Sequence, residues 1–292
     1  MGIIFADARH LIEARAGASG GRAVTLGRLT TYLHPSDLRE LRRLVGGDPA
    51  ARAWLDCYQW GIPADGFFRD VLKFDSVDSI DFSEYQGATI VHDLSTPLPA
   101  ELEQSFDLAV DGGTLEHVFN FPVAIANLMR LVRVGGRVYS KGPCNNLAGH
   151  GFYQFSPELM HRIFSPRHGF ETEFVRLAET RYHSVEATTG HRIYEVVDPD
   201  AVGRRVNLVT RYPVLILTMA RRISEAEPFR EPVLQSDYVT KWGEGTGAAR
   251  KAGGLKELAR RYVPAKAWTL ARGAAMRRTA SLGNSRHFKR IW

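Results

Sequence analysis

The sequence predicts an α/β protein built on a mostly parallel sheet, and three features of one stretch carry this prediction. Residues 106–110 (FDLAV) form a short apolar run that Asp-Gly-Gly at 111–113 ends, as expected of a buried parallel strand. Apolar residues then recur at helical spacing over 123–132, and the glycine pair at 135–136 predicts the end of that helix. Residues 137–140 return to an extended pattern. Such a strand–helix–strand unit closes right-handed, and ligands of open α/β sheets bind at the carboxyl ends of the strands.

Composition bounds the class of protein. A length of 292 residues with 44% hydrophobic content predicts one large domain with appendages. The two cysteines, Cys57 and Cys144, are too few for a disulfide framework, which favours a reducing cytoplasm. The longest apolar run, 212–220, is far below the roughly 20 residues needed to span a bilayer, and the first residues carry no secretion or acylation signal. We expect a cytoplasmic protein, soluble or peripheral to the inner face of the membrane.

The residues FDLAVDGGTLEHV, followed by LVRVGGRV, resemble the central signature of the class I S-adenosylmethionine-dependent methyltransferases. The segment GHGFYQFSP at 149–157 resembles a divergent, methyltransferase-like branch of that superfamily. The resemblance covers residues 22–223 and implies a three-layer, Rossmann-like sheet, mostly parallel with an antiparallel last strand. It also implies S-adenosyl-L-methionine as cofactor.

The first predicted strand, 22–26, is followed by Gly27. In the family a loop of several glycines approaches the methionine part of the cofactor here, and Gly27 is what remains of it, so this glycine loop is degenerate. A competing loop lies at 61–66, but the residues before it read as helix. We therefore favour Gly27 and interpret 50–74 as a helical insertion.

Two acidic strand ends are expected to bind the nucleoside. A short strand ends at Asp81-Phe82, and by resemblance Asp81 accepts both ribose hydroxyls, since two carboxylate oxygens match a vicinal diol. A third strand is followed by Asp93-Leu94; by resemblance Asp93 accepts the adenine amino group and the neighbouring backbone reads the ring edge. Both aspartates are also ordinary turn and cap residues, and this alternative stays open.

By resemblance, the loop that contains Gly113, Thr114 and Leu115 lies against the cofactor, with His117 beside the sulfonium and the acceptor. An imidazole there can stack, donate a hydrogen bond or take up a proton near neutral pH. The alternative is that His117 only caps the helix that follows.

Polar residues are concentrated in the segment 145–154, which follows the predicted strand 137–140. We interpret His150 as a general base, and Asn145, Asn146 and Tyr153 as groups that position the acceptor. Alternatively, these side chains tie down a lid. Transfer of a sulfonium methyl group is an in-line displacement that depends on positioning, and no HxxxH or HxxH pair is present, so no metal is expected.

The remaining chain closes the sheet and adds a charged tail. Residues 171–177 and 212–219 predict an antiparallel closing pair around an insertion at 180–209, after an N-terminal extension at 1–21. Beyond a linker at 224–249, the tail 250–292 carries twelve Lys and Arg against one acid. A basic amphipathic helix with tryptophan suits an anionic membrane surface; a solvated helix is the alternative, and nucleic acid is not favoured because no binding module is recognisable.

Together these features predict methyl transfer from S-adenosylmethionine to a small-molecule or carbohydrate-type acceptor. The alternative is a non-catalytic binding or scaffold protein of the same fold, peripheral to a membrane. Loss of the glycine loop is the feature that favours this alternative.

Overall fold

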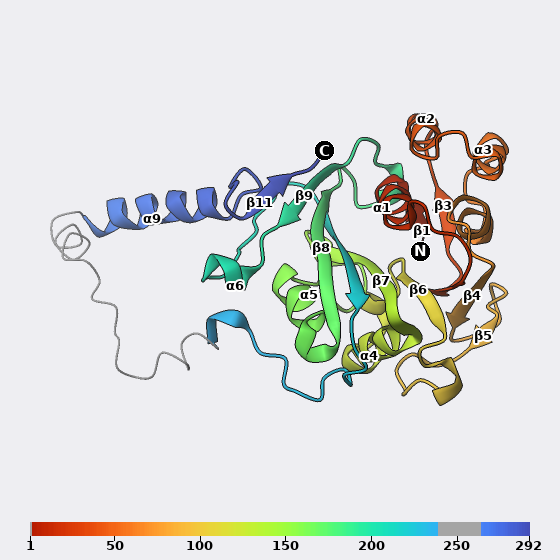
Figure 1. Cartoon of the computed structure of the whole chain (residues 1–292). Coiled ribbons are helices and arrows are strands. Elements are labelled where there is room, and N and C mark those ends of the chain that lie inside the picture. The colour runs from red at the N-terminus through yellow and green to blue at the C-terminus, as the bar shows by residue number, and fades with distance from the viewer. Residues whose placement is uncertain (1, 239–263) are drawn as a thin grey trace.

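The computed structural model describes residues 2–238 and 264–292 (Figure 1). Its helices are α1 (Phe5–Arg15), α2 (Pro35–Leu44), α3 (Pro49–Asp56), α4 (Phe121–Leu131), α5 (Pro157–Ile163), α6 (Pro199–Val202) and α9 (Ala265–Thr279). Its strands are β1 (Gly2–Ile4), β2 (Arg22–Leu26), β3 (Thr30–Tyr32), β4 (Ser76–Asp81), β5 (Ile90–Val91), β6 (Phe106–Asp111), β7 (Val132–Asn145), β8 (Phe170–Glu179), β9 (Arg192–Val196), β10 (Val214–Arg222) and β11 (Phe288–Arg290).

The main sheet has the order β11-β9-β8-β10-β7-β6-β2-β4-β5 within the described residues. The half from β7 to β5 is parallel, and β10 lies antiparallel between β7 and β8. The predicted α/β fold and its antiparallel closing strand are therefore confirmed, but the sheet is mixed. The sheet has more strands than predicted, because β9, from the predicted insertion, and β11, from the predicted tail, add two antiparallel strands at its edge.

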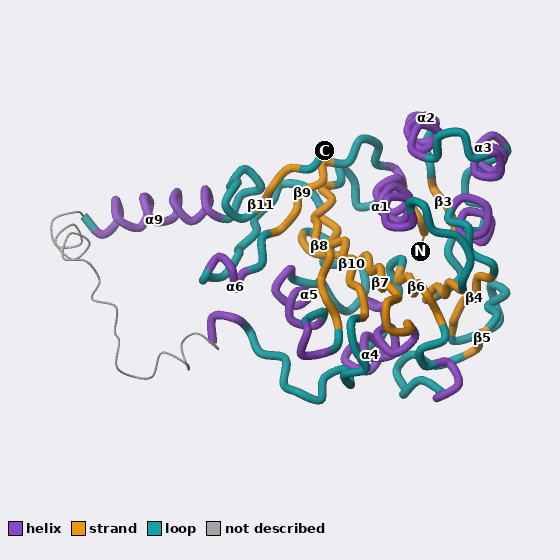
Figure 2. Tube along the Cα trace, viewed as in Figure 1, coloured by secondary structure: helices purple, strands orange, loops and turns teal. Residues whose placement is uncertain are grey.

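Helices cover both faces of the sheet (Figure 2). In β6, Leu108 and Val110 pack with α1, α2 and α3, whereas Ala109 packs with α4 and α5 on the other side. This alternation follows from the two-residue period of a strand. Since β2 lies in the middle of the sheet, the strand order reverses between β2 and β6, and a ligand crevice is expected at their carboxyl ends.

The β6–α4–β7 unit differs from its prediction at the glycine pair. Helix α4 ends at Leu131 and β7 begins at once, so Gly135-Gly136 does not stop the helix. Instead, the pairing of β6 with β7 shifts register there, and Gly135 has φ +88°. A Cβ on Gly136 would lie 3.0 Å from the Asp107 carbonyl oxygen, so close approach of two strands requires this glycine.

The first 21 residues, predicted as an extension, contribute to the core. Helix α1 buries Ala8 and Leu11 against the sheet, and β1 pairs in parallel with β3. The region predicted as a helical insertion holds α3 and one π-helical turn, Phe67–Val71.

Of the predicted amphipathic tail, the residues before 264 lie outside the described chain. The described residues form two parts, helix α9 and the segment that contains β11. Helix α9 extends away from the sheet and buries none of its residues (Figure 1). Its larger apolar side chains, Trp268, Leu270 and Met276, fall on different sides, so this helix is basic but not amphipathic. The final residues return to the body, where β11 joins the sheet and Trp292 contacts α1.

Trp292 and Phe174 enclose His10, a fully buried residue of α1, with ring centroids 5.0 and 4.9 Å away. Burial, together with the charge of Arg176, lowers the pKa of His10 to about 3. Folded His10 is therefore neutral at any pH between 3 and its ordinary value near 6.5, while the unfolded chain takes up a proton.

This difference predicts acid destabilisation. Between pH 7.5 and 5.0 the His10 contribution should lower the free energy of unfolding by about 2 kcal/mol, and His10→Leu should remove that part of the loss. Urea unfolding at the two pH values measures it, with His183→Leu, at an exposed histidine, as control. An equal loss in wild type and His10→Leu would contradict the assignment.

Candidate functional site

Two cavities adjoin at the carboxyl ends of the parallel strands. The β4–β5 cavity, about 350 Å³, is lined by Asp81, Phe82, Asp93, Leu94, Thr114 and His117 among others. The β6–β7 cavity, about 190 Å³, is lined by Gly113, Glu116, His117, Lys141, Gly142 and His150 among others. His117 lines both, so the two cavities meet at this side chain.

Asp81 and three aromatic rings define the β4–β5 cavity. One Asp81 oxygen accepts the Phe82 N–H at 2.7 Å, and within the described residues its other oxygen has no protein partner. The cavity wall includes Phe82, Phe119 and Phe152, with exposed fractions of 74, 76 and 68%. The sequence analysis missed Phe119 and Phe152; aromatic residues within otherwise polar loops are the signal that marks them.

Asp93 and Leu94 also line this cavity. One Asp93 oxygen accepts the Ser95 N–H at 2.9 Å, and hydrogen bonds from Ser95 lower the pKa of this carboxyl. One carboxylate oxygen of Asp93 therefore stabilises the turn at 93–95, which is the role that the alternative interpretation gives to this residue. Leu94 is buried and forms the apolar floor.

Asp111, at the end of β6, holds the loop between the two cavities. It is fully buried; one oxygen accepts the Thr114 N–H at 2.8 Å and the Gly113 N–H at 3.2 Å, and the other accepts the Ser140 hydroxyl at 2.7 Å. Burial, and then the nearby Glu116 carboxylate, raise the pKa of Asp111. Leu115 is buried in the core and lines neither cavity.

Gly27 lies just after β2 with φ +71°, and its N–H donates to the Ile80 carbonyl at 2.6 Å. It lines neither cavity. The space beside it is occupied by the protein itself: Thr114 donates its hydroxyl to the Leu26 carbonyl at 2.7 Å, and a Cβ on Gly112 would lie 2.7 Å from the Leu29 side chain. The degenerate glycine loop is thus replaced by a filled crevice between β2 and β6.

Three polar residues of the segment after β7 are placed away from the cavities. Asn145 and Asn146 donate to Thr210 at 2.9 Å, and Tyr153 donates its hydroxyl to the Phe119 carbonyl at 2.6 Å. These contacts fix the loop ends, as the lid interpretation expects. The structure brings none of the three to the cavity walls.

His150 does reach the β6–β7 cavity, together with a residue that the sequence analysis left out of the site. His150 Nε2 lies 3.4 Å from Oε1 of Glu116, whose side chain is buried. A hydrogen bond that His150 donates to the Glu116 carboxylate raises the pKa of His150. The His117 ring lies beside the His150 ring, with centroids 5.2 Å apart.

A buried ion pair builds another part of the wall of the β6–β7 cavity. Lys141 Nζ lies 2.6 Å from Asp7 Oδ2 and also donates to the Gly2 carbonyl, while Tyr139 donates its hydroxyl to Asp7 Oδ1 at 2.7 Å. This cluster fastens β1 across the end of β7, so that Gly2 and Ile4 face the cavity.

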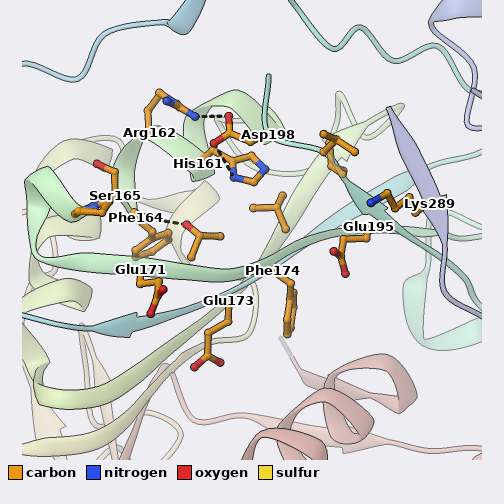
Figure 3. A pocket seen from close by; sticks show the side chains of 15 residues that line it. His161, Arg162, Phe164, Ser165, Glu171, Glu173, Phe174, Glu195, Asp198 and Lys289 are labelled. Atoms are coloured by element: carbon orange, nitrogen blue, oxygen red, sulfur yellow. Dashed lines mark hydrogen bonds and ion pairs between the residues drawn. The ribbon is translucent and has the colours of Figure 1, made fainter. Parts of the chain in front are cut away.

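A larger groove, about 490 Å³, lies between α5, β8 and β9 (Figure 3). It runs along the amino-terminal half of β8, away from the carboxyl ends of the parallel strands. Its acids are paired: Glu173 with Arg137 at 2.8 Å, Glu195 with Arg176 at 3.2 Å, and Asp198 with Arg162. We therefore assign the candidate site to the two strand-end cavities.

No family model matches the chain, and no curated protein matches it. Solved structures do. A 1,6-didemethyltoxoflavin-N1-methyltransferase from Burkholderia thailandensis, with bound S-adenosylhomocysteine, is 13% identical over 75% of this chain and 78% of its own, with a TM-score of 0.39. A SAM-dependent methyltransferase from Thermotoga maritima is 14% identical over 75% and 89%, with a TM-score of 0.40. A TehB-like SAM-dependent methyltransferase from Corynebacterium glutamicum is 16% identical over 74% and 86%, with a TM-score of 0.37.

Among the described residues, no helix combines the length and apolar character that crossing a membrane requires.

The Asp7–Lys141 pair gives a stability prediction. Asp7→Ala should cost about 3–5 kcal/mol in urea unfolding, because it leaves a buried ammonium without its carboxylate. The double variant Asp7→Leu/Lys141→Met should recover most of that loss. Glu40→Ala, which removes the exposed pair with Arg43, is the control. A cost no greater than that of this control would show that the buried pair does not anchor β1.

Proposed function

We propose that this protein transfers a methyl group from S-adenosyl-L-methionine to a small-molecule or carbohydrate-type acceptor. One observation carries the proposal: two cavities that share His117 in their walls lie at the carboxyl ends of the parallel strands, on either side of the filled crevice between β2 and β6. One cavity offers groups suited to a nucleoside and the other offers groups suited to proton transfer.

The β4–β5 cavity suits the nucleoside because its polar and aromatic groups match the two halves of such a ligand. The Asp81 oxygen without a protein partner can accept ribose hydroxyls, and the exposed rings of Phe82, Phe119 and Phe152 offer flat surfaces to the base. Asp93 and Leu94 complete the base end. The methionine part would then follow Gly113 and Thr114, rather than Gly27, toward His117.

The β6–β7 cavity would hold the acceptor. In the transfer step an acceptor oxygen attacks the methyl carbon; the new carbon–oxygen bond forms as the carbon–sulfur bond breaks, and the thioether leaves with the electron pair. His150 would receive the acceptor's proton, and the Glu116 carboxylate 3.4 Å away, which stabilises its imidazolium form, supports this role. His117, between the cavities, would orient the two reactants.

An anionic membrane surface is the proposed location, on the cytoplasmic side, with a lipid-linked carbohydrate as one acceptor that fits it. Helix α9 carries Lys266, Arg272, Arg277 and Arg278 and no acid, and each basic residue near such a surface contributes about 1 kcal/mol of attraction. Because the helix is not amphipathic, the attraction would be electrostatic rather than by insertion.

Calorimetry with S-adenosylhomocysteine tests the cofactor site. Asp81→Ala should weaken binding by tenfold or more, about 1.4 kcal/mol, because a carboxylate contact to the ribose is lost. Asp78→Ala is the matched control: Asp78 lies on the same strand, pairs with Arg22 at 3.1 Å and does not line the cavity. Absence of binding by the wild type would favour the non-catalytic scaffold.

Vesicle sedimentation tests the membrane proposal. Replacing Lys266, Arg272, Arg277 and Arg278 by alanine should lower binding to phosphatidylserine-containing vesicles by more than tenfold at low salt and leave S-adenosylhomocysteine affinity unchanged. Equal binding to neutral and anionic vesicles would contradict an electrostatic surface contact.

A further inference from the structure

We propose that Glu116, His117 and His150 form a binding site for a divalent first-row transition-metal ion in the β6–β7 cavity. One ligand atom from each residue lies within 4.8 Å of the others. His117 and His150 come from different loops, 33 positions apart, which is why spacing motifs in the sequence do not reveal the cluster.

The spacing is close to what an ion requires. Metal–ligand bonds of about 2.0–2.2 Å place neighbouring ligand atoms roughly 3–3.5 Å apart. Glu116 Oε1 and His150 Nε2, at 3.4 Å, already meet this spacing. The His117 ligand atom lies within 4.8 Å of both, and its imidazole is exposed, so we expect a side-chain rotation to bring it to the same spacing.

Glu116 supplies an independent reason to expect a cation. Its side chain is buried, and its Oε2 atom has no hydrogen-bond partner within the described residues. An unpartnered carboxylate oxygen costs free energy when it is removed from water. Lys141, a cation on the wall of the same cavity, is already bound to Asp7 and Gly2.

Glycines let the backbone approach this carboxylate closely. A Cβ on Gly113 would lie 3.2 Å from Oε1, and one on Gly142 would lie 3.6 Å from Oε2. The loop that carries Glu116 and His117 is fixed from behind by Asp111, whose two oxygens are occupied by the Gly113 and Thr114 N–H groups and the Ser140 hydroxyl. A loop that is hydrogen-bonded from behind and faces a cavity is the construction of a preorganised site.

The ligand types select the class of ion. Two imidazole nitrogens and one carboxylate favour Zn²⁺, Fe²⁺, Mn²⁺ or Co²⁺ over Mg²⁺ and Ca²⁺, which prefer oxygen ligands. Three protein ligands leave at least one coordination position open.

The use of that open position rests on the proposed function. A hydroxyl of the acceptor would bind there, and the ion would lower its pKa so that its proton passes to solvent before the oxygen attacks the methyl group. With the ion bound, His150 would be a metal ligand, and the ion would take over from it the activation of the acceptor hydroxyl. The β4–β5 cavity would still bind the nucleoside.

Cobalt titration of the chelator-treated full-length protein tests the site. We expect visible d–d absorption that saturates at about one Co²⁺ per chain. Affinity should fall tenfold or more in Glu116→Gln, His117→Gln and His150→Ala, and stay unchanged in His183→Ala, which removes an exposed histidine outside the cluster. Glu116→Gln and His117→Gln retain side-chain size, and circular dichroism of each variant checks folding.

The result that overturns the inference is a wild type without saturable Co²⁺ absorption, or cluster variants that bind as the wild type does. S-Adenosylhomocysteine calorimetry on the same samples separates the two proposals. Cofactor binding without Co²⁺ binding leaves the methyltransferase proposal standing with His150 as base. Co²⁺ binding without cofactor binding leaves the metal site standing alone.

Discussion

The candidate site depends on one buried carboxylate, Asp111. Asp111 is the last residue of β6, next to the point where the strand order reverses. One of its oxygens accepts hydrogen bonds from the loop that follows, and the other accepts a hydrogen bond from Ser140 of β7. The loop separates the cavities and presents Thr114 to one, Glu116 to the other and His117 to both. Asp111 is the hydrogen-bond acceptor that the buried N–H groups of Gly113 and Thr114 need, and these bonds fix the conformation of the loop.

The sequence was most informative where local pattern and fold agree. The β6–α4–β7 unit was predictable because a buried strand, an amphipathic helix and a second strand each have a distinct period. The glycine pair at 135–136 was misread because close approach between strands and a helix stop require the same residue type.

Contacts between distant segments were not predictable. Glu116 stands beside His117 in the sequence, yet its burial and its approach to His150 depend on how two loops meet above the sheet. Asn145 and Asn146 drew attention as a polar pair, but their partners at 210–212 are supplied by the loop that precedes β10. Asp7 gave no signal in the sequence, because its role depends on Lys141 and Tyr139 more than 130 positions later.

The packing of Trp292 on α1 has a consequence for how the chain folds. Trp292 contacts Arg9 and His10, which lie 283 and 282 positions earlier in the sequence. Contacts of such high sequence separation form only after a long loop has closed, which slows folding. Until they form, this part of α1 stays uncovered and open to association with other chains.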